Sequence, residues 1–344
     1  MRDPINGDRQ DLKRAPTLAD VAKRSGVAPA TVSRALNTPS LVREPTRARI
    51  MEAVTALGYY ANPAARALAG SPWRTVGVIA PSLDHAMFHH QLSIFEQEMA
   101  ARDVLPLISA SNYDSATELR LVDSLLARGV DGVLLTHVDR PDLVFDVLQT
   151  RGVPVVVMSS LPDERAIWIG YDELDSMSPV VDHLYGLGHR SFAIVGDARA
   201  AVHGRARIAA VRKRLSDLAV ELSPNRVIRC GFDPKDARAA LRKLMTLEPK
   251  PTAIVCGNDW LALSVLAEAD ESGLKVPYDI SVTGFDDIDL AGHPRLSLTT
   301  VKVPWRELGR AAAETLHRAI LGRSVGKQVF RTSLMVRQST GSPD

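Results

Sequence analysis

Hydrophobic and polar residues follow two different patterns along this chain. Between residues 17 and 58, apolar positions recur three or four apart, which predicts three helices, the second at 29–37 and the third at 44–57. From residue 73 onward, short β-rich runs alternate with amphipathic stretches. The expected strands lie at 75–79, 104–109, 132–135, 154–157, 192–195, 253–256 and 281–285, and clear helices at 116–128, 175–187 and 260–272.

The alternation after residue 73 predicts an α/β body. Apolar strands separated by helices are typical of doubly wound parallel sheets with helices on both faces. Some 270 residues exceed what one such sheet comfortably holds, as domains rarely grow beyond about 250 residues. We therefore expect an all-α head followed by two doubly wound α/β lobes.

The first two helices of the head are joined by a recognisable turn. Thr17 and Asp20 have the spacing of a capping box at the start of the first helix. Gly26 suits the left-handed conformation at its end, and Pro29 can begin the second helix without losing an amide donor. The pattern is typical of a helix-turn-helix that places its second helix in the major groove of DNA, with a purely structural three-helix module as the alternative.

Charge is unevenly distributed between head and body. Of the 344 residues, 42 are Lys or Arg and 40 are Asp or Glu, a net charge of only +2. Residues 1–70, however, hold eleven basic and six acidic residues, so the rest of the chain is slightly acidic. A basic head suggests a polyanion partner for the head alone, although a solvated charged face would show the same composition.

The remaining composition bears on the cell compartment. Cys230 and Cys256 form no disulfide or zinc pattern and are expected to be buried thiols. The N-terminus has no apolar signal core, and no apolar run approaches the roughly 18–20 residues that span a bilayer. A cytoplasmic protein without a membrane partner is predicted.

Several segments together resemble a known family. The residues that carry the resemblance are Thr17-Leu18-Ala19-Asp20-Val21-Ala22, Gly26-Val27, Thr31-Val32-Ser33-Arg34, Asn37, Gly58-Tyr59 and Asn62-Pro63 through Leu68-Ala69. They resemble the head of LacI/GalR-family repressors over about 55 residues. The remainder resembles, more loosely, that family's periplasmic-binding-protein-like regulatory domain. The resemblance implies a sequence-specific DNA-binding transcriptional regulator, a repressor rather than an enzyme, whose operator affinity depends on a small sugar-type effector.

The resemblance also implies a domain plan. It consists of a disordered tail at 1–16, a helix-turn-helix domain at 17–61, a hinge helix and linker at 62–72, and a two-lobed effector and dimerisation domain at 73–340. The N-lobe is expected at about 73–158 plus 289–320, and the C-lobe at about 159–288 plus 321–340. Two heads on one pseudo-palindromic operator require a homodimer.

By resemblance, bases are read by Pro29, Ala30 and Arg34 of the second helix. Arg34 alone can form bidentate hydrogen bonds, preferably to guanine. Further DNA contacts, mainly to phosphate, are assigned to Thr17, Thr31, Ser33, Asn37 and Tyr59. The hinge is expected to fold only on DNA, with Asn62 as its N-cap and Leu68 wedged into the minor groove; Ala65 is its third contact. A plain linker is the alternative.

The effector residues are likewise carried over by position. They are Phe88, Thr136, Ser159, His203, Arg207, Phe232, Asn258, Trp260 and Asp286. Asn258 could instead simply cap the helix that follows, and Phe88 and Phe232 could be ordinary core residues. Fixed polar groups with aromatic faces suit a sugar, sugar acid or sugar phosphate. Ser159 stands where aspartate is common in the family, so the site has one carboxylate fewer while Arg207 is kept, and this mildly favours an anionic sugar.

Other functions fit the sequence less well. No phosphate-binding loop, nucleophile elbow, metalloprotease motif or dinucleotide fingerprint is present, so no enzyme and no cofactor is expected. Among His85, His89 and His90, only His85 and His89 have the spacing of two metal ligands on one helix. No third ligand has motif spacing, so no metal is expected either. A free-standing sugar-binding protein is the other alternative, and the fused head argues against it.

Overall fold

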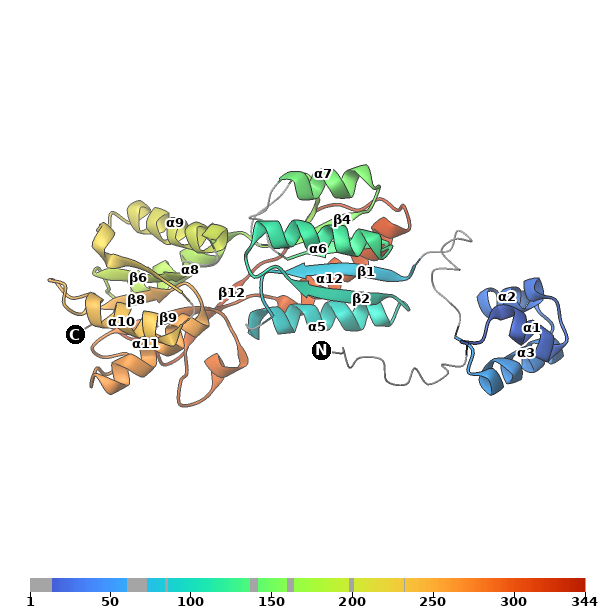
Figure 1. Ribbon diagram of the computed structural model, residues 1–344. Helices are drawn as coiled ribbons and strands as arrows, with labels where there is room; N and C mark the ends of the chain where they lie inside the picture. Colours follow the sequence, from blue (N-terminus) through green and yellow to red (C-terminus); the bar gives the residue numbers. More distant parts are fainter. Residues whose placement is uncertain are drawn as a thin grey trace, which may run out of the picture. The chain divides into compact units, whose positions relative to one another are not determined.

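The computed structural model describes residues 14–60, 73–83, 86–136, 142–159, 164–197, 201–231 and 233–343. The chain divides into two compact units, one ending at Trp73 and one beginning at Arg74 (Figure 1). Each unit is built around its own hydrophobic core.

The first unit contains a small three-helix head. Its elements are α1 (Leu18–Ser25), α2 (Pro29–Asn37), the short 3-10 helix η1 (Pro39–Leu41) and α3 (Glu44–Leu57). Val21, Val32 and Ile50, one from each α-helix, are fully buried against one another. The helical spacing of apolar residues therefore does form the predicted head core.

The ends of the head helices have local causes. The Asp20 carboxylate accepts hydrogen bonds from the backbone N–H of Thr17, at 2.8 Å, and from its hydroxyl, at 2.6 Å. Gly26 ends α1 with a φ of 68°, in the left-handed region that glycine adopts without strain. These features confirm the predicted turn between α1 and α2.

The first lobe of the second unit is a six-stranded sheet in the order β11-β5-β4-β3-β1-β2, with all its pairs parallel. Helices α6 and α7 cover one face, and α5 and α12 the other (Figure 1). The elements are β1 (Thr75–Ala80), α5 (Ala86–Ala100), β2 (Leu105–Ala110), α6 (Ser115–Ala127), β3 (Gly132–Leu135), α7 (Asp142–Thr150), β4 (Val155–Ser159), β5 (Ile167–Gly170), α12 (Trp305–Ile320) and β11 (Gln328–Val329).

The second lobe repeats this plan with the order β12-β10-β9-β8-β6-β7, in which only β12 is antiparallel. Its helices α8 and α9 lie on one face, α10 and α11 on the other (Figure 1). The elements are α8 (Glu173–Gly186), β6 (Phe192–Asp197), α9 (Ala201–Asp217), η2 (Pro224–Arg226), β7 (Val227–Cys230), α10 (Pro234–Leu244), β8 (Ala253–Cys256), α11 (Asp259–Glu271), β9 (Ser281–Asp286), η3 (Asp289–Gly292), β10 (Thr299–Lys302) and β12 (Ser333–Met335).

The expected lobe boundaries were wrong at three strands. β5 and β11 belong to the first sheet and not to the C-lobe, and β10 belongs to the second sheet and not to the N-lobe. The chain therefore crosses between the lobes after β5, after β10 and after β11. Each misplaced strand is only two to four residues long, so its pairing depends on neighbours distant in sequence.

The two cysteines are buried, as expected. Burial raises the pKa of the Cys256 thiol well above its ordinary value, so this thiol stays protonated and unreactive. Among the described residues, no helix combines the length and apolar character needed to cross a membrane.

Candidate DNA-reading and effector sites

The predicted base-reading residues of the head lie on the outer face of α2. Pro29, Ala30 and Arg34 are exposed, whereas Val32 and Ala35 of the same helix are buried in the core. Within the described part of the chain, the Arg34 guanidinium forms no ion pair. The face is therefore available to an outside partner.

The predicted phosphate contacts lie on α2 itself, just before α1 and just after α3. Thr17, Thr31, Ser33 and Tyr59 are half-buried and Asn37 is exposed. The Asn37 side-chain amide donates to the Ser33 hydroxyl at 3.2 Å, so these two groups sit together one turn apart on α2. The predicted hinge contacts, Asn62, Ala65 and Leu68, lie outside the described residues.

In the second unit, Arg207 of α9 occupies a buried polar cluster, with only 7% of its surface exposed. Its Nε donates to both carboxylate oxygens of Glu173, at 3.1 and 3.2 Å. Nη1 donates to the Gly257 carbonyl at 2.7 Å, and Nη2 to the Tyr171 hydroxyl at 3.1 Å. The guanidinium also lies over the Phe285 ring, 3.7 Å from its centroid. These contacts fix the arginine in one position.

The electrostatics of this cluster keep Arg207 charged. Burial alone lowers its pKa, but the carboxylate of Glu173, followed by Tyr171 and Asp286, outweighs burial, so the pKa of Arg207 is raised. Burial also raises the pKa of the Tyr171 phenol, which stays protonated and can accept the arginine's hydrogen bond.

Two further predicted effector residues lie beside this arginine. Asn258 follows Gly257, whose carbonyl accepts a hydrogen bond from Arg207, and Asp286 follows Phe285, over whose ring the guanidinium lies. The Asn258 side-chain oxygen accepts from the Leu261 backbone N–H at 2.9 Å, so the helix-capping role considered for Asn258 is real. Its amide donors are not used by that bond and remain suited to a ligand.

The other predicted effector residues vary in position. Thr136 follows β3 and is 4% exposed, and its hydroxyl has no hydrogen-bond partner among the described residues. His203 is half-buried, and its Nδ1 lies 3.8 Å from Oε1 of Glu173. The side chain of Trp260 is 45% exposed. Phe88 lies in α5 and Ser159 ends β4, but their side chains, like Phe232 as a whole, lie outside what is described.

Sequence reasoning missed four residues of the cluster. Tyr171 and Glu173 hold Arg207, Phe285 stacks on it, and Trp305 packs edge-on against Tyr171 with ring centroids 6.2 Å apart. Tyr171 follows β5 and Trp305 begins α12, so both lie where the chain crosses between lobes. A buried arginine is generally expected to have a carboxylate partner, but the spacing of residues in the sequence does not show which Asp or Glu pairs with Arg207.

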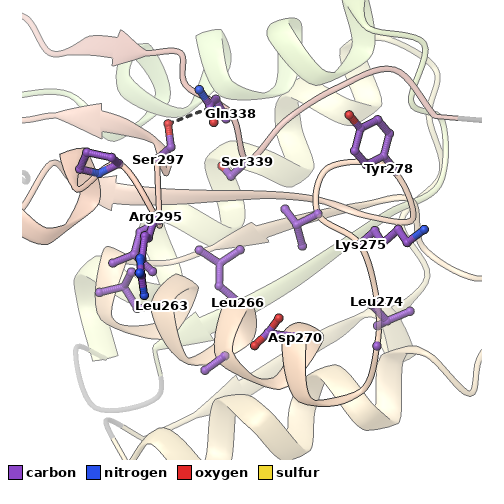
Figure 2. Close-up of a pocket in the computed structure, with 15 residues that line it drawn as sticks. Leu263, Leu266, Asp270, Leu274, Lys275, Tyr278, Arg295, Ser297, Gln338 and Ser339 are labelled. Atoms are coloured by element: carbon purple, nitrogen blue, oxygen red, sulfur yellow. Dashed lines mark hydrogen bonds between the residues drawn. The ribbon is translucent and has the colours of Figure 1, made fainter.

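A separate groove of about 690 Å³ lies on the second lobe (Figure 2). Leu263, Leu266 and Asp270 of α11 line one side, and Tyr278, Arg295 and Gln338 are also part of the lining. None of the predicted effector residues lines it, so this groove is distinct from the arginine cluster. Among the described residues, no group of three or more His, Cys, Asp or Glu side chains is arranged to hold a metal ion.

Comparison with known proteins defines the class of the chain. Residues 17–62 match the family model for bacterial regulatory proteins of the lacI family, and residues 181–340 match the periplasmic binding protein-like domain. The HTH-type transcriptional repressor CytR of Escherichia coli K12 is 30% identical over 332 residues, covering 95% of this chain and 96% of CytR. The HTH-type transcriptional regulator GntR of Pseudomonas aeruginosa is 31% identical over 337 residues, covering 94% of this chain and 96% of GntR.

Solved structures agree with this class. The Lac repressor dimer bound to operator and the anti-inducer ONPF has a TM-score of 0.85 and 28% identity, covering 95% of this chain and all of that chain. The complex of the regulator CelR with cellobiose has a TM-score of 0.71 and 27% identity, and the match covers 94% of this chain and 99% of that chain. The chain belongs to the LacI family: it is a helix-turn-helix transcriptional regulator, not an enzyme.

Proposed function

We propose that this regulator acts in the cytoplasm as a homodimer that binds a pseudo-palindromic operator through α2 of each head. The observation that supports this most is the exposed face of α2, where Arg34 projects from a helix whose opposite face forms the core. Arg34 would read guanine, while Pro29 and Ala30 would add apolar contacts. A two-fold symmetric protein matches two half-sites of opposite direction.

In the domain arrangement that we propose, residues 17–61 form the DNA-binding domain and 62–72 a hinge that folds on DNA. Residues 73–340 bind effector and dimerise. Effector binding would change how the lobes sit and thereby whether two hinges can meet on the operator. As a repressor, the protein would block transcription while bound.

The proposed effector is a sugar, sugar acid or sugar phosphate held by Arg207, Asn258 and Asp286. Thr136, at the carboxyl end of β3, has a buried hydroxyl with no hydrogen-bond partner among the described residues, and such a group is suited to bond a ligand. The relative CelR was solved with cellobiose, and another LacI family regulator with ribose.

Operator selection from a random DNA library tests the DNA-binding part. Full-length protein should enrich a palindromic sequence and bind it at least about 10³-fold more tightly than unrelated DNA at physiological salt. Equal, salt-sensitive affinity for all fragments would refute the proposal. A thermal-shift screen with sugars, sugar acids and sugar phosphates tests the effector part, because a ligand that binds only the folded state raises Tm.

A further inference from the structure

The chain enters the second unit through a residue with a strained backbone. Arg74 is the first residue of that unit and the last residue before β1, and its φ is 55°. This left-handed conformation is disfavoured for a residue that has a Cβ, because the Cβ comes too close to the following carbonyl oxygen. Such a conformation persists where contacts from the surrounding structure hold it.

Asp131, in the turn between α6 and β3, supplies such a contact. Its Oδ2 accepts hydrogen bonds from the backbone N–H of Arg74, at 2.6 Å, and from that of Thr75, at 3.3 Å. Successive backbone N–H groups at such a turn form a concave donor site that binds an anionic oxygen. The Asp131 N–H donates in turn to the Thr75 carbonyl, at 2.8 Å. We call Arg74, Thr75 and Asp131 the linker clamp.

The side chain of Arg74 makes a further, weaker attachment. Its guanidinium forms an ion pair with Asp103, in the turn before β2. The two side chains are 52% and 81% exposed, and ion pairs at such exposure contribute little. The backbone bonds to Asp131 are therefore the contact that holds Arg74 in its conformation.

One buried strand joins the linker clamp to the proposed effector site. Asp131 precedes β3, and Thr136 follows the other end of the same strand. All four residues of β3 are buried, and the strand pairs with β1 on one side and β4 on the other. A strand packed in this way shifts as a unit, because a close-packed core transmits displacement. A ligand that moves Thr136 would thereby move Asp131 and the point at which the chain leaves the lobe.

We propose that Asp131 is a positioning residue for operator binding. By holding Arg74 in the left-handed conformation, it fixes the direction in which the chain leaves the first lobe toward the head. This inference rests on the proposed function, in which operator affinity depends on whether two hinges can meet. A fixed exit direction reduces the conformational freedom that specific binding must remove, whereas contacts to phosphate alone do not require it.

The first test compares Arg74→Gly with Arg74→Pro in the full-length protein. Both remove the side chain and its ion pair, but glycine adopts a positive φ freely, whereas proline fixes φ at about −65° and lacks the N–H that Asp131 binds. Affinity is measured for the operator selected from the random library and for a scrambled duplex of the same length. We expect Arg74→Pro to lower the ratio of operator to scrambled affinity at least about tenfold, and Arg74→Gly to keep the wild-type ratio within about twofold.

The second test changes the acceptor of the same hydrogen bonds. Asp131→Ala removes it and should behave like Arg74→Pro, whereas Asp131→Asn keeps a carbonyl oxygen that can accept from both N–H groups and should restore the ratio. Asp123→Ala, at an exposed position of α6, is the matched control. Tm of each variant shows that it is folded under the conditions of the assay.

A third test needs no DNA. Trypsin cuts after Arg74 when the chain there opens locally, so the fragment beginning at Thr75 should form faster in Asp131→Ala than in wild type or Asp123→Ala. An unchanged cleavage rate would overturn the linker clamp. Equal affinity ratios in Arg74→Pro and Arg74→Gly would overturn its role in operator binding. Failure to enrich any operator would instead refute the proposed function, while the trypsin result still shows whether Asp131 holds Arg74.

Discussion

Asp259 is a buried carboxylic acid whose replacement has a calculable effect. It begins α11 and is fully buried. Its Oδ2 accepts from the Ile288 backbone N–H at 2.9 Å, and its Oδ1 accepts from the Thr300 hydroxyl. A Cβ at position 284 would lie 2.2 Å from Oδ1, so only glycine allows this close approach.

Burial raises the pKa of Asp259 to about 7 from an ordinary value of 3.8, and the hydrogen bonds from Thr300 and Ile288 offset only part of that rise. The folded state therefore binds a proton that the unfolded state releases, and stability falls as pH rises from 3.8 to about 7. Each pH unit in that window corresponds to about 1.4 kcal/mol. The loss between pH 5 and pH 8 is therefore about 3 kcal/mol.

The variant Asp259→Asn removes this titration while keeping both hydrogen bonds, because its amide can donate to Thr300 and accept from Ile288. We expect the free energy of unfolding of the variant, relative to wild type, to rise by about 3 kcal/mol from pH 5 to pH 8. Urea unfolding followed by tryptophan fluorescence measures this difference. The first tryptophan in the sequence is Trp73, so the fluorescence reports unfolding of the α/β body and not of the helical head. Asp270→Asn, on the exposed side of the same helix, is the control. Parallel pH curves for wild type and Asp259→Asn would refute the reasoning.

Three other changes have expected outcomes. Arg34→Ala should weaken operator binding by about 1–3 kcal/mol and relax preference at one base pair per half-site; an operator-substitution series checks this, and equal loss at every position would contradict it. Arg207→Ala should lower the free energy of unfolding by about 3–5 kcal/mol because it breaks the buried ion pair with Glu173. Urea titration measures this loss, and a loss below about 1 kcal/mol would contradict the reasoning. Burial lowers the pKa of His189 below its ordinary 6.5, so the free energy of unfolding should fall as pH drops below 6.5. His189→Gln should lose less stability over the same pH range. The same pH dependence of stability in wild type and variant would argue against this.

Much of the head could be predicted because its signals are local. The helix end at Gly26, the bonds between Asp20 and Thr17, and the start of α2 at Pro29 each depend on residues a few positions apart. The buried and exposed faces of α2 follow from helical periodicity alone. The exposed face of α2, which we propose reads DNA, therefore follows from local sequence without any tertiary contact.

Which sheet each strand joins, and what surrounds Arg207, depended on tertiary structure. β5, β10 and β11 are too short to show their sheet in their own sequence, and pairing with distant strands places them. Glu173 precedes Arg207 by 34 residues, and only the packing of α8 against α9 brings them together. The sequence by itself determined the family and the exposed face of α2 that we propose reads DNA, because those properties are local. The partner of Arg207 was decided by the fold, because a buried ion pair between two helices has no signature in the spacing of its residues.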